Sequence, residues 1–314
     1  MLRADRAFGL LVLLALVSSA ILLALLATLI PHAGVLLSGV ARPEDAVAVL
    51  LLGLATIGIS LGLTSLVRQM FGTLRLIRSL LAKRIAVPQV VRVAAAAMGL
   101  DGRIDVVDDE RPFSFCYWFI RPRICISTSL VRRLEAEELR AVLFHERYHL
   151  HHRDPLRLVI ARYFAAGLYV VPVVEELVEH FVLEKELEAD QDAVRAMGDV
   201  RPLASALYAL LPDADEVSLG LLVPVGPLSV TEARIDHLVD GRPLPVAIRP
   251  ASIALSGGAL LAACVLVAVQ GPSLVVGHVP PVLSVPGLLV GPASLLFVAA
   301  VTGGVQQVRL VVHR

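Results

Sequence analysis

His145-Glu146-Arg147-Tyr148-His149 has the pattern H-E-x-x-H, and the rest of the chain can be interpreted outward from it. On a helix, residues four positions apart share one face, so His145 and His149 can direct two imidazoles at one metal ion. Glu146 would lie beside them, where a carboxylate can act as general base toward a water that the metal activates. The pattern therefore predicts a catalytic metal site.

A second acidic motif, Glu186-Leu187-Glu188-Ala189-Asp190, follows farther along the chain. Glu186 could supply a third ligand and leave a fourth position open, which is the arrangement of a catalytic rather than a structural zinc site. Asp190 lies four residues later on the same face, where it could accept a hydrogen bond from a ligand imidazole. His180 and Glu184 remain alternative ligands. The predicted set is His145, His149 and Glu186 on Zn²⁺, Glu146 as catalytic base, and Asp190 behind the ligands.

Three short runs before the motif, residues 104–107, 113–119 and 123–127, have the composition of strands and are separated by Arg-Pro turns. We expect a small antiparallel sheet. The aromatic run at 113–119 is either an edge strand that pairs with a substrate peptide or part of the core. A helix over residues 135–152 then carries the motif and ends before Asp154-Pro155, where Asp154 is expected to be structural.

Long apolar runs show that the chain is not an ordinary soluble protein, since 57% of its residues are hydrophobic. Residues 8–30 and 46–67 carry no charge, and each matches one membrane span of about 20 residues. Residues 251–308 also carry no charge and are long enough for two spans. We expect about four transmembrane helices, the first an uncleaved anchor because it is longer than a signal-peptide core.

The distribution of basic residues predicts the orientation of these spans. Arg3 and Arg6 precede the first span, and a cluster of Arg and Lys at residues 68–92 follows the second. By the positive-inside rule, both ends of this hairpin and the H-E-x-x-H region face the cytoplasm. Residues 68–84 read as an amphipathic helix, which either lies along the inner membrane surface or extends the second span.

An apolar segment at residues 156–174 could be mistaken for a further span. The chain must return to the metal at Glu186, and a helical hairpin of that length has arms of roughly 25 Å, too short to cross a ~30 Å core twice. We expect a hairpin at residues 156–185 that dips partly into the membrane and reverses at Pro172. Gly58 and Gly62 form a G-x-x-x-G pattern, which is typical of close helix packing.

These boundaries divide the chain into three parts: an N-terminal transmembrane hairpin at residues 1–67, a metallopeptidase domain at 68–249, and a C-terminal transmembrane hairpin with a short tail at 250–314. The three cysteines form no C-x-x-C pair, which suits a reducing compartment. The net charge of zero gives no indication of a direct nucleic-acid partner. The richness in Arg, Ala, Leu and Val suggests a bacterial source.

Several segments together resemble the membrane-bound zinc metallopeptidases of the BlaR/MecR type and their HtpX and CAAX-protease relatives. The resemblance implies a gluzincin peptidase domain with His145, His149 and Glu186 on zinc and Glu146 as base. The chain departs from the usual pattern at Arg147-Tyr148, where a small or apolar pair is usual. The similar segments are Arg121-Pro122-Arg123-Ile124, Ser127-Thr128-Ser129-Leu130, residues 138–143, His152-Arg153-Asp154-Pro155, Glu186 to Asp190 and, more loosely, residues 231–235 with Leu238.

We therefore expect an α-rich integral membrane protein with a cytoplasmic α+β gluzincin-type zinc-peptidase domain, located in the bacterial cell membrane as a multi-pass protein. It would be a zinc metalloendopeptidase that cleaves protein or peptide substrates at the cytoplasmic face of the lipid bilayer. The BlaR/MecR resemblance suggests a regulatory protease with a cytoplasmic repressor as substrate. The HtpX resemblance suggests quality control of membrane proteins. The competing class is a non-catalytic membrane signalling scaffold that keeps the peptidase fold.

Overall fold

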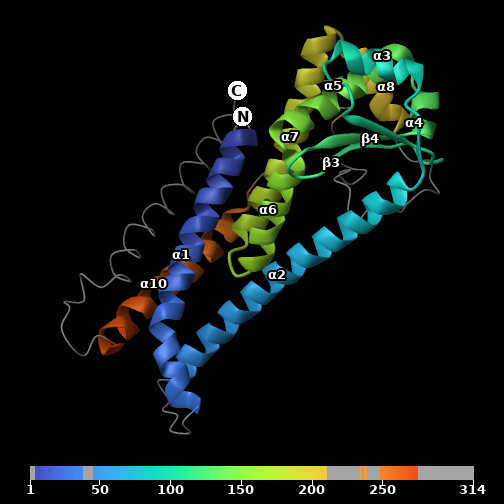
Figure 1. The fold of residues 1–314 in the computed structure, drawn as a ribbon. Coiled ribbons are helices and arrows are strands. Elements are labelled where there is room, and N and C mark those ends of the chain that lie inside the picture. Colours follow the sequence, from blue (N-terminus) through green and yellow to red (C-terminus); the bar gives the residue numbers. More distant parts are fainter. Residues whose placement is uncertain (1–3, 38–44, 211–233, 235–236, 239–247, 275–314) are drawn as a thin grey trace. The chain divides into compact units, whose positions relative to one another are not determined.

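The structure is a computed structural model that describes residues 4–37, 45–210, 234, 237–238 and 248–274. The chain separates into two compact units. The first consists of residues 1–66, 161–181 and 246–314, and the second of residues 67–160 and 182–245. Most described residues are helical and the second unit holds one small sheet (Figure 1), as expected for an α-rich protein with an α+β domain.

The first unit is built from long apolar helices, and α1 packs against α10. By length and composition, Ala4–Ile21 and Gly53–Leu81 could each cross a membrane. The apolar stretch Pro250–Val265 is shorter than these two. The fourth predicted span, after residue 274, lies outside the described residues. The long apolar helices of this unit are α1 (Ala4–Leu37), the first part of α2 (Asp45–Leu81) and α10 (Pro250–Leu274).

Helix α2 does not end where the apolar run ends at Val67 but continues without a break to Leu81. Of the two readings of residues 68–84, the structure therefore shows the extension of the second helix. Ile77 and Leu80 are buried in a cluster with aromatic residues of the sheet. This end of α2 consequently packs on the second unit's own core, and its position relative to a membrane surface stays a prediction.

The predicted hairpin is present as helices α6 (Asp154–Gly167) and α7 (Val173–Met197), with Pro172 just before α7. Its tip belongs to the first unit. A Cβ atom built on Gly58 of α2 would lie 2.6 Å from the carbonyl oxygen of Gly167, and one on Gly62 would lie 3.3 Å from the Cα of Gly167. The backbones of α2 and α6 therefore touch at glycines, and the G-x-x-x-G face is a packing face. How deeply the hairpin enters a membrane stays a prediction.

The sheet has the order β1-β2-β4-β3, and its two central strands are parallel. The prediction of a wholly antiparallel sheet was wrong because the chain passes from β2 to the edge strand β3 before it returns as β4, so β2 pairs in parallel with β4 and not with β3. The two-residue strand β1 was not predicted. Strand β3 is an edge strand among the described residues. The strands are β1 (Arg84–Ile85), β2 (Ile104–Val107), β3 (Ser114–Tyr117) and β4 (Arg123–Ser127).

A single buried carboxylate, that of Asp105 in β2, joins all four strands. It accepts hydrogen bonds from the Tyr117 hydroxyl of β3 at 2.5 Å and from the Arg123 Nε of β4 at 2.5 Å. The Arg84 Nε of β1 lies 2.8 Å from its other oxygen. Burial alone would raise the pKa of Asp105, but these partners outweigh it and lower that pKa below its usual value. The edge strand is thus fixed by charge as well as by backbone pairing.

Helix α5 (Ala136–His152) begins and ends close to the predicted limits. Glu135 and Glu138 form a reciprocal capping box at its start, which satisfies two backbone N–H groups that have no partner inside the helix. Arg153 ends it in the left-handed conformation, with φ of 53°. Leu139 and Leu143 are buried in the core shared with the sheet. The remaining helices are α3 (Gln89–Ala97), α4 (Thr128–Arg133) and α8 (Arg201–Ala209).

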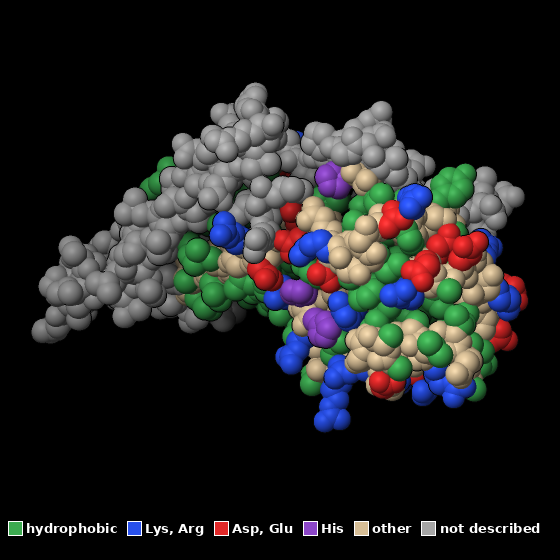
Figure 2. Space-filling view, turned by 90° about the horizontal axis from the view of Figure 1, so that it is seen from above, with side chains coloured by type: hydrophobic (Ala, Val, Ile, Leu, Met, Phe, Trp, Pro, Cys, Tyr) green, Lys and Arg blue, Asp and Glu red, His purple; other side chains and the backbone are tan. Residues whose placement is uncertain are grey.

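The surface drawn in Figure 2 carries charged side chains of both signs. Lys and Arg side chains lie among Asp and Glu side chains, with hydrophobic side chains between them. The same mixing occurs pairwise at the helices, where Arg140 pairs with Glu137 at 2.9 Å and Arg201 with Asp199 at 2.7 Å. The face drawn in Figure 2 therefore has no patch of a single sign among the described residues.

Candidate metal centre

Helix α5 presents the two histidines of the motif to one point, as the spacing of four residues requires. The Nε2 atoms of His145 and His149 lie 3.0 Å apart, and both side chains are buried. The capped start of α5 and its packing on the sheet fix the face on which they project. Two imidazole nitrogens at this separation are close enough to bind one ion.

Helix α7 brings a carboxylate to the same point. Glu186 places Oε2 at 3.5 Å from the Nε2 of His145 and Oε1 at 3.6 Å from the Nε2 of His149. These three residues can each offer a ligand atom within 4.8 Å of the others. Neither His180 nor Glu184, the alternatives, belongs to this group within the described part of the chain. Two histidines and one carboxylate form a typical catalytic zinc set, with a fourth position open.

Each ligand imidazole has a carboxylate at its other nitrogen. The Oδ1 of Asp190 lies 2.9 Å from the Nδ1 of His145, and the Oδ2 of Asp154 lies 2.6 Å from the Nδ1 of His149. A proton held on Nδ1 by a carboxylate leaves the Nε2 lone pair for a metal. Two such lone pairs facing each other at 3.0 Å favour a cation between them, so this donor set fits a metal ion.

Asp154 was assigned a structural role in the sequence, and the structure gives it a partner that spacing did not predict. It is buried and follows the left-handed turn at Arg153, which directs the start of α6 back toward His149. An Asp five residues after the second motif histidine, immediately beyond the helix end, was the available signal. Asp154 therefore belongs with Asp190 behind the ligands.

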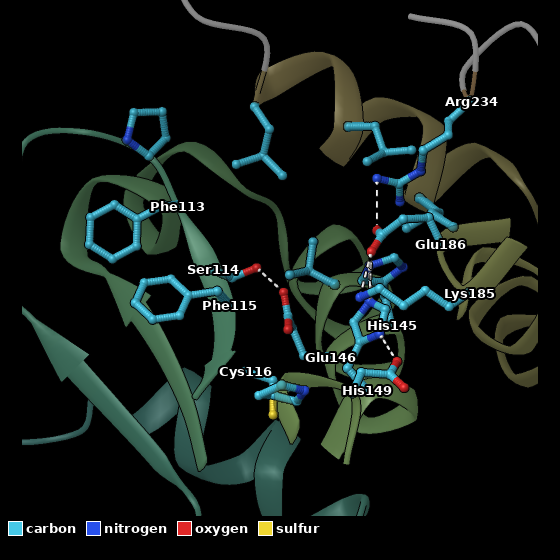
Figure 3. A pocket seen from close by; sticks show the side chains of 17 residues that line it. Phe113, Ser114, Phe115, Cys116, His145, Glu146, His149, Lys185, Glu186 and Arg234 are labelled. Carbon is cyan, nitrogen blue, oxygen red and sulfur yellow. Dashed lines mark hydrogen bonds and ion pairs between the residues drawn. The ribbon is translucent and has the colours of Figure 1, made fainter. Parts of the chain in front are cut away.

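Glu146 projects from α5 toward the edge strand of the sheet. Its Oε1 accepts a hydrogen bond from the Ser114 hydroxyl of β3 at 2.7 Å, and Figure 3 shows the two side chains pointing toward each other. Ser114 and Cys116 line the pocket together with Phe113 and Phe115, and these two rings also pack with Tyr117 in the core. The structure therefore agrees with both interpretations of the aromatic run. Its aromatic rings pack in the core, and strand β3 lies at the edge of the sheet among the described residues.

Two buried cations that sequence patterns did not assign also lie at the centre. The Nζ of Lys185 is 3.3 Å from the Oε1 of Glu186, and the Nη1 of Arg234 is 3.2 Å from its Oε2 (Figure 3). Against two positive charges the pocket holds four carboxylates, so a divalent cation would balance the total. The four carboxylates are those of Glu146, Asp154, Glu186 and Asp190.

Burial and neighbouring charges act in opposite senses on the pKa values of His145 and Glu186. Burial lowers the pKa of His145, but the carboxylates of Asp190 and Glu186 outweigh it and raise that pKa to about 9. Burial raises the pKa of Glu186, but His149, Lys185 and Arg234 hold it well below its usual value. Glu186 is therefore ionised at neutral pH, which is the state that a carboxylate ligand must have.

The pocket over these residues is a cavity of about 120 Å³. Its walls come from the edge strand, α5, α7 and α8, so both halves of the second unit contribute to it. The Arg147-Tyr148 pair, which departs from the usual motif, is used for packing: the Tyr148 hydroxyl hydrogen-bonds Glu188 of α7, and its ring stacks on His152 at 4.0 Å. These contacts tie α5 to the helix that carries Glu186.

Comparison with known proteins gives two matches. A family model described as BlaR1 peptidase M56 matches residues 40–207, more than half of the chain. The chain is also similar to Protease HtpX homolog 1 of Streptomyces coelicolor, with 31% identity over 90 residues. That match covers 28% of this chain and 27% of the relative, so the chain spans about a quarter of that protein's length. Both matches confirm the resemblance seen in the motifs, and the chain belongs to the BlaR1 peptidase M56 family.

Proposed function

We propose that this protein is a membrane-embedded zinc endopeptidase that cleaves protein substrates at the cytoplasmic face of the membrane. The observation that carries the proposal is the convergence of His145, His149 and Glu186 beside a separate carboxylate, that of Glu146. A zinc ion held by these three ligands would supply Lewis acidity toward a peptide carbonyl and would ease the deprotonation of a water molecule.

Glu146 is the group in this pocket that can move a proton. Its Oε1 is engaged by the Ser114 hydroxyl, which leaves Oε2 to accept the proton of the attacking water and to deliver it to the leaving amine. Ser114 would hold the carboxylate in one orientation during both transfers. Asp190 and Asp154 would keep the two imidazoles turned toward the metal.

The edge strand offers a place for the substrate backbone. Strand β3 pairs with β4 on one side and is the last strand of the sheet among the described residues. An extended peptide added to that free edge would run past Ser114 and Glu146. Because backbone hydrogen bonds make such pairing tolerant of sequence, it supports cleavage of proteins rather than of one small molecule.

The experiment compares the full-length protein with Glu146→Gln and His149→Ala in detergent micelles, measuring bound zinc and cleavage of a fluorescently labelled unfolded protein. Loss of the general base should lower the cleavage rate on the order of 10²- to 10⁴-fold while zinc stays bound. His149→Ala should lose both zinc and cleavage. Wild-type cleavage by Glu146→Gln would refute the mechanism, and zinc-loaded wild-type protein without any cleavage would favour the signalling scaffold.

The nature of the substrate divides the proposal in two. The BlaR/MecR resemblance suggests a regulatory protease, whose substrate would be a cytoplasmic repressor, whereas the similarity to the Streptomyces relative suggests a protease of the HtpX type. Proteome-wide comparison of cells with wild-type protein and with Glu146→Gln distinguishes them. A single soluble DNA-binding protein that accumulates in the variant supports the first, and many membrane proteins support the second.

The proposed topology places the second unit in the cytoplasm and the tip of the α6–α7 hairpin in the inner part of the membrane. The tip belongs to the unit that holds the apolar helices, and α6 touches α2 at Gly58. In intact cells, an impermeant maleimide should fail to label Tyr169→Cys at the tip but should label His278→Cys between the last two predicted spans. Labelling of the tip would mean that residues 156–174 cross the bilayer. The native cysteines are buried and give little background.

A further inference from the structure

Arg234 is a buried cation that contacts two residues of the metal centre. Its Nε and Nη2 donate to the Oδ2 and Oδ1 of Asp190 at 2.8 and 2.6 Å. Its Nη1 lies 3.2 Å from the Oε2 of Glu186, the contact drawn in Figure 3. Only 7% of the residue is exposed. One planar guanidinium therefore joins Glu186, a proposed ligand, to Asp190, the carboxylate that contacts the proposed ligand His145.

We propose that Arg234 is a positioning residue of the metal centre. Its fork fixes the plane of Asp190, which in turn orients the ring of His145 through the 2.9 Å contact to Nδ1. Its third contact engages Oε2 of Glu186, and the Lys185 ammonium lies 3.3 Å from Oε1, so the Glu186 carboxylate is held between two cations. The inference rests on the proposed zinc site.

The need for such a group follows from the spacing on α7. Glu186 and Asp190 are four residues apart, so two negative charges share one face of the helix, and both residues are buried. Like charges at this spacing repel. A guanidinium can satisfy both carboxylates in fixed directions, whereas a lysine ammonium is a point charge that cannot form the parallel pair of hydrogen bonds.

Charge alone makes the opposite prediction, and this separates the two explanations. A cation beside the ligands repels Zn²⁺, so removing it would tighten zinc binding if its net charge were its only effect. If Arg234 positions Asp190 and Glu186, its removal weakens zinc binding in spite of the lost repulsion. The sign of the change in affinity therefore decides between them.

The test uses full-length Arg234→Gln and Arg234→Lys in detergent micelles, with zinc affinity measured by competition with a chelator and ligand geometry read from the absorption spectrum of the cobalt-substituted protein. We expect Arg234→Gln to bind zinc about 10- to 100-fold more weakly and Arg234→Lys to recover only part of the loss. Both should change the cobalt spectrum. The matched control is Arg201→Gln, since Arg201 pairs with Asp199 at the surface at 2.7 Å, and it should change neither quantity.

Unchanged or tighter zinc binding in Arg234→Gln would overturn the proposal, as would an Arg234→Lys protein with the affinity and spectrum of the wild type. If Arg234→Gln does not fold, Arg234→Lys carries the same test because it retains the buried positive charge. Failure of the proposed function would look different, because the His149→Ala variant would then keep its zinc.

Discussion

Each of the two compact units is stabilised internally by a different kind of contact. In the first unit α2 meets α6 at glycines, close enough that a Cβ on Gly58 would lie 2.6 Å from a backbone oxygen. In the second unit, buried carboxylates join elements that are far apart in sequence, as Asp105 joins four strands. Helices with apolar surfaces can associate through close backbone approach at small residues, as these two helices do. A metal centre needs defined directions, which charged hydrogen bonds supply.

The contrast is not absolute, because the described part of the first unit also contains a polar cluster. Glu176 of α7 accepts hydrogen bonds from the backbone and the side chain of Arg249 at 2.9 and 2.6 Å, and from Ser252 at 2.6 Å. The Glu176 carboxylate meets the start of α10, where backbone N–H groups lack partners within the helix. In the first unit, charged hydrogen bonds thus stabilise the start of α10, whereas close backbone packing joins α2 and α6 along their lengths.

The largest expected effect concerns Asp105. Asp105→Asn should lower the free energy of unfolding by about 3 kcal/mol at neutral pH, the lower end of the range for breaking a buried ion pair, because Arg84 and Arg123 are partly exposed. The pKa of Asp105 is lowered in the folded state, so its contribution is complete above the unfolded pKa of about 3.9 and is lost as the pH falls through the folded value.

Chemical denaturation in micelles at neutral and acidic pH measures this difference. Asp108→Asn serves as the control, since Asp108 is exposed. A variant as stable as the wild type at neutral pH would show that the four-strand contact contributes nothing, and a difference that grew on acidification would contradict the direction of the pKa shift.

The next effect concerns the carboxylate behind His149. Asp154→Ala should weaken zinc binding about 10- to 100-fold, because the Nδ1 proton of His149 loses its acceptor at 2.6 Å. The zinc affinity of Asp154→Asn should lie between those of Asp154→Ala and the wild type, since an amide oxygen can still accept a hydrogen bond. Chelator competition measures both, with Glu137→Ala on the exposed face of α5, the helix that carries His149, as control. Equal affinities in all four proteins would return Asp154 to a purely structural role.

The smallest of these effects tests packing by shape. Gly58→Ala should destabilise the first unit by about 1–3 kcal/mol, because the added methyl meets the Gly167 carbonyl, which belongs to backbone and cannot swing aside. Gly53→Ala, five residues earlier on α2, has nothing within 4 Å of the added methyl and should be neutral or slightly stabilising. Thermal unfolding in micelles compares them. Identical melting of the two variants would show that α2 and α6 do not meet at these glycines.

Local patterns predicted much of this molecule. The limits of α5 follow from the acidic cap before Ala136 and the turn before Asp154, and the start of α7 follows from Pro172. The meeting of His145, His149 and Glu186 could be inferred because helical phase fixes two of them and chemistry demands a third. The family was recognisable from the same segments.

What escaped the sequence depends on contacts between distant residues. The parallel pairing of β2 with β4 places the intervening strand at the edge, which no run of residues encodes by itself. The contact between Asp154 and His149 depends on a left-handed turn at Arg153, a residue type that rarely adopts it. Arg234 lies 44 residues beyond Asp190, with no spacing rule to connect them.

The central claim is that two histidines and one carboxylate hold zinc, and zinc X-ray absorption of the full-length protein tests it most directly. The account predicts one zinc per chain with nitrogen and oxygen ligands at about 2.0–2.2 Å, reduced to background by His149→Ala. Cys116 lines the same pocket, so the measurement also offers a clear alternative. A sulfur ligand near 2.3 Å, or zinc that survives loss of His149, would contradict the account.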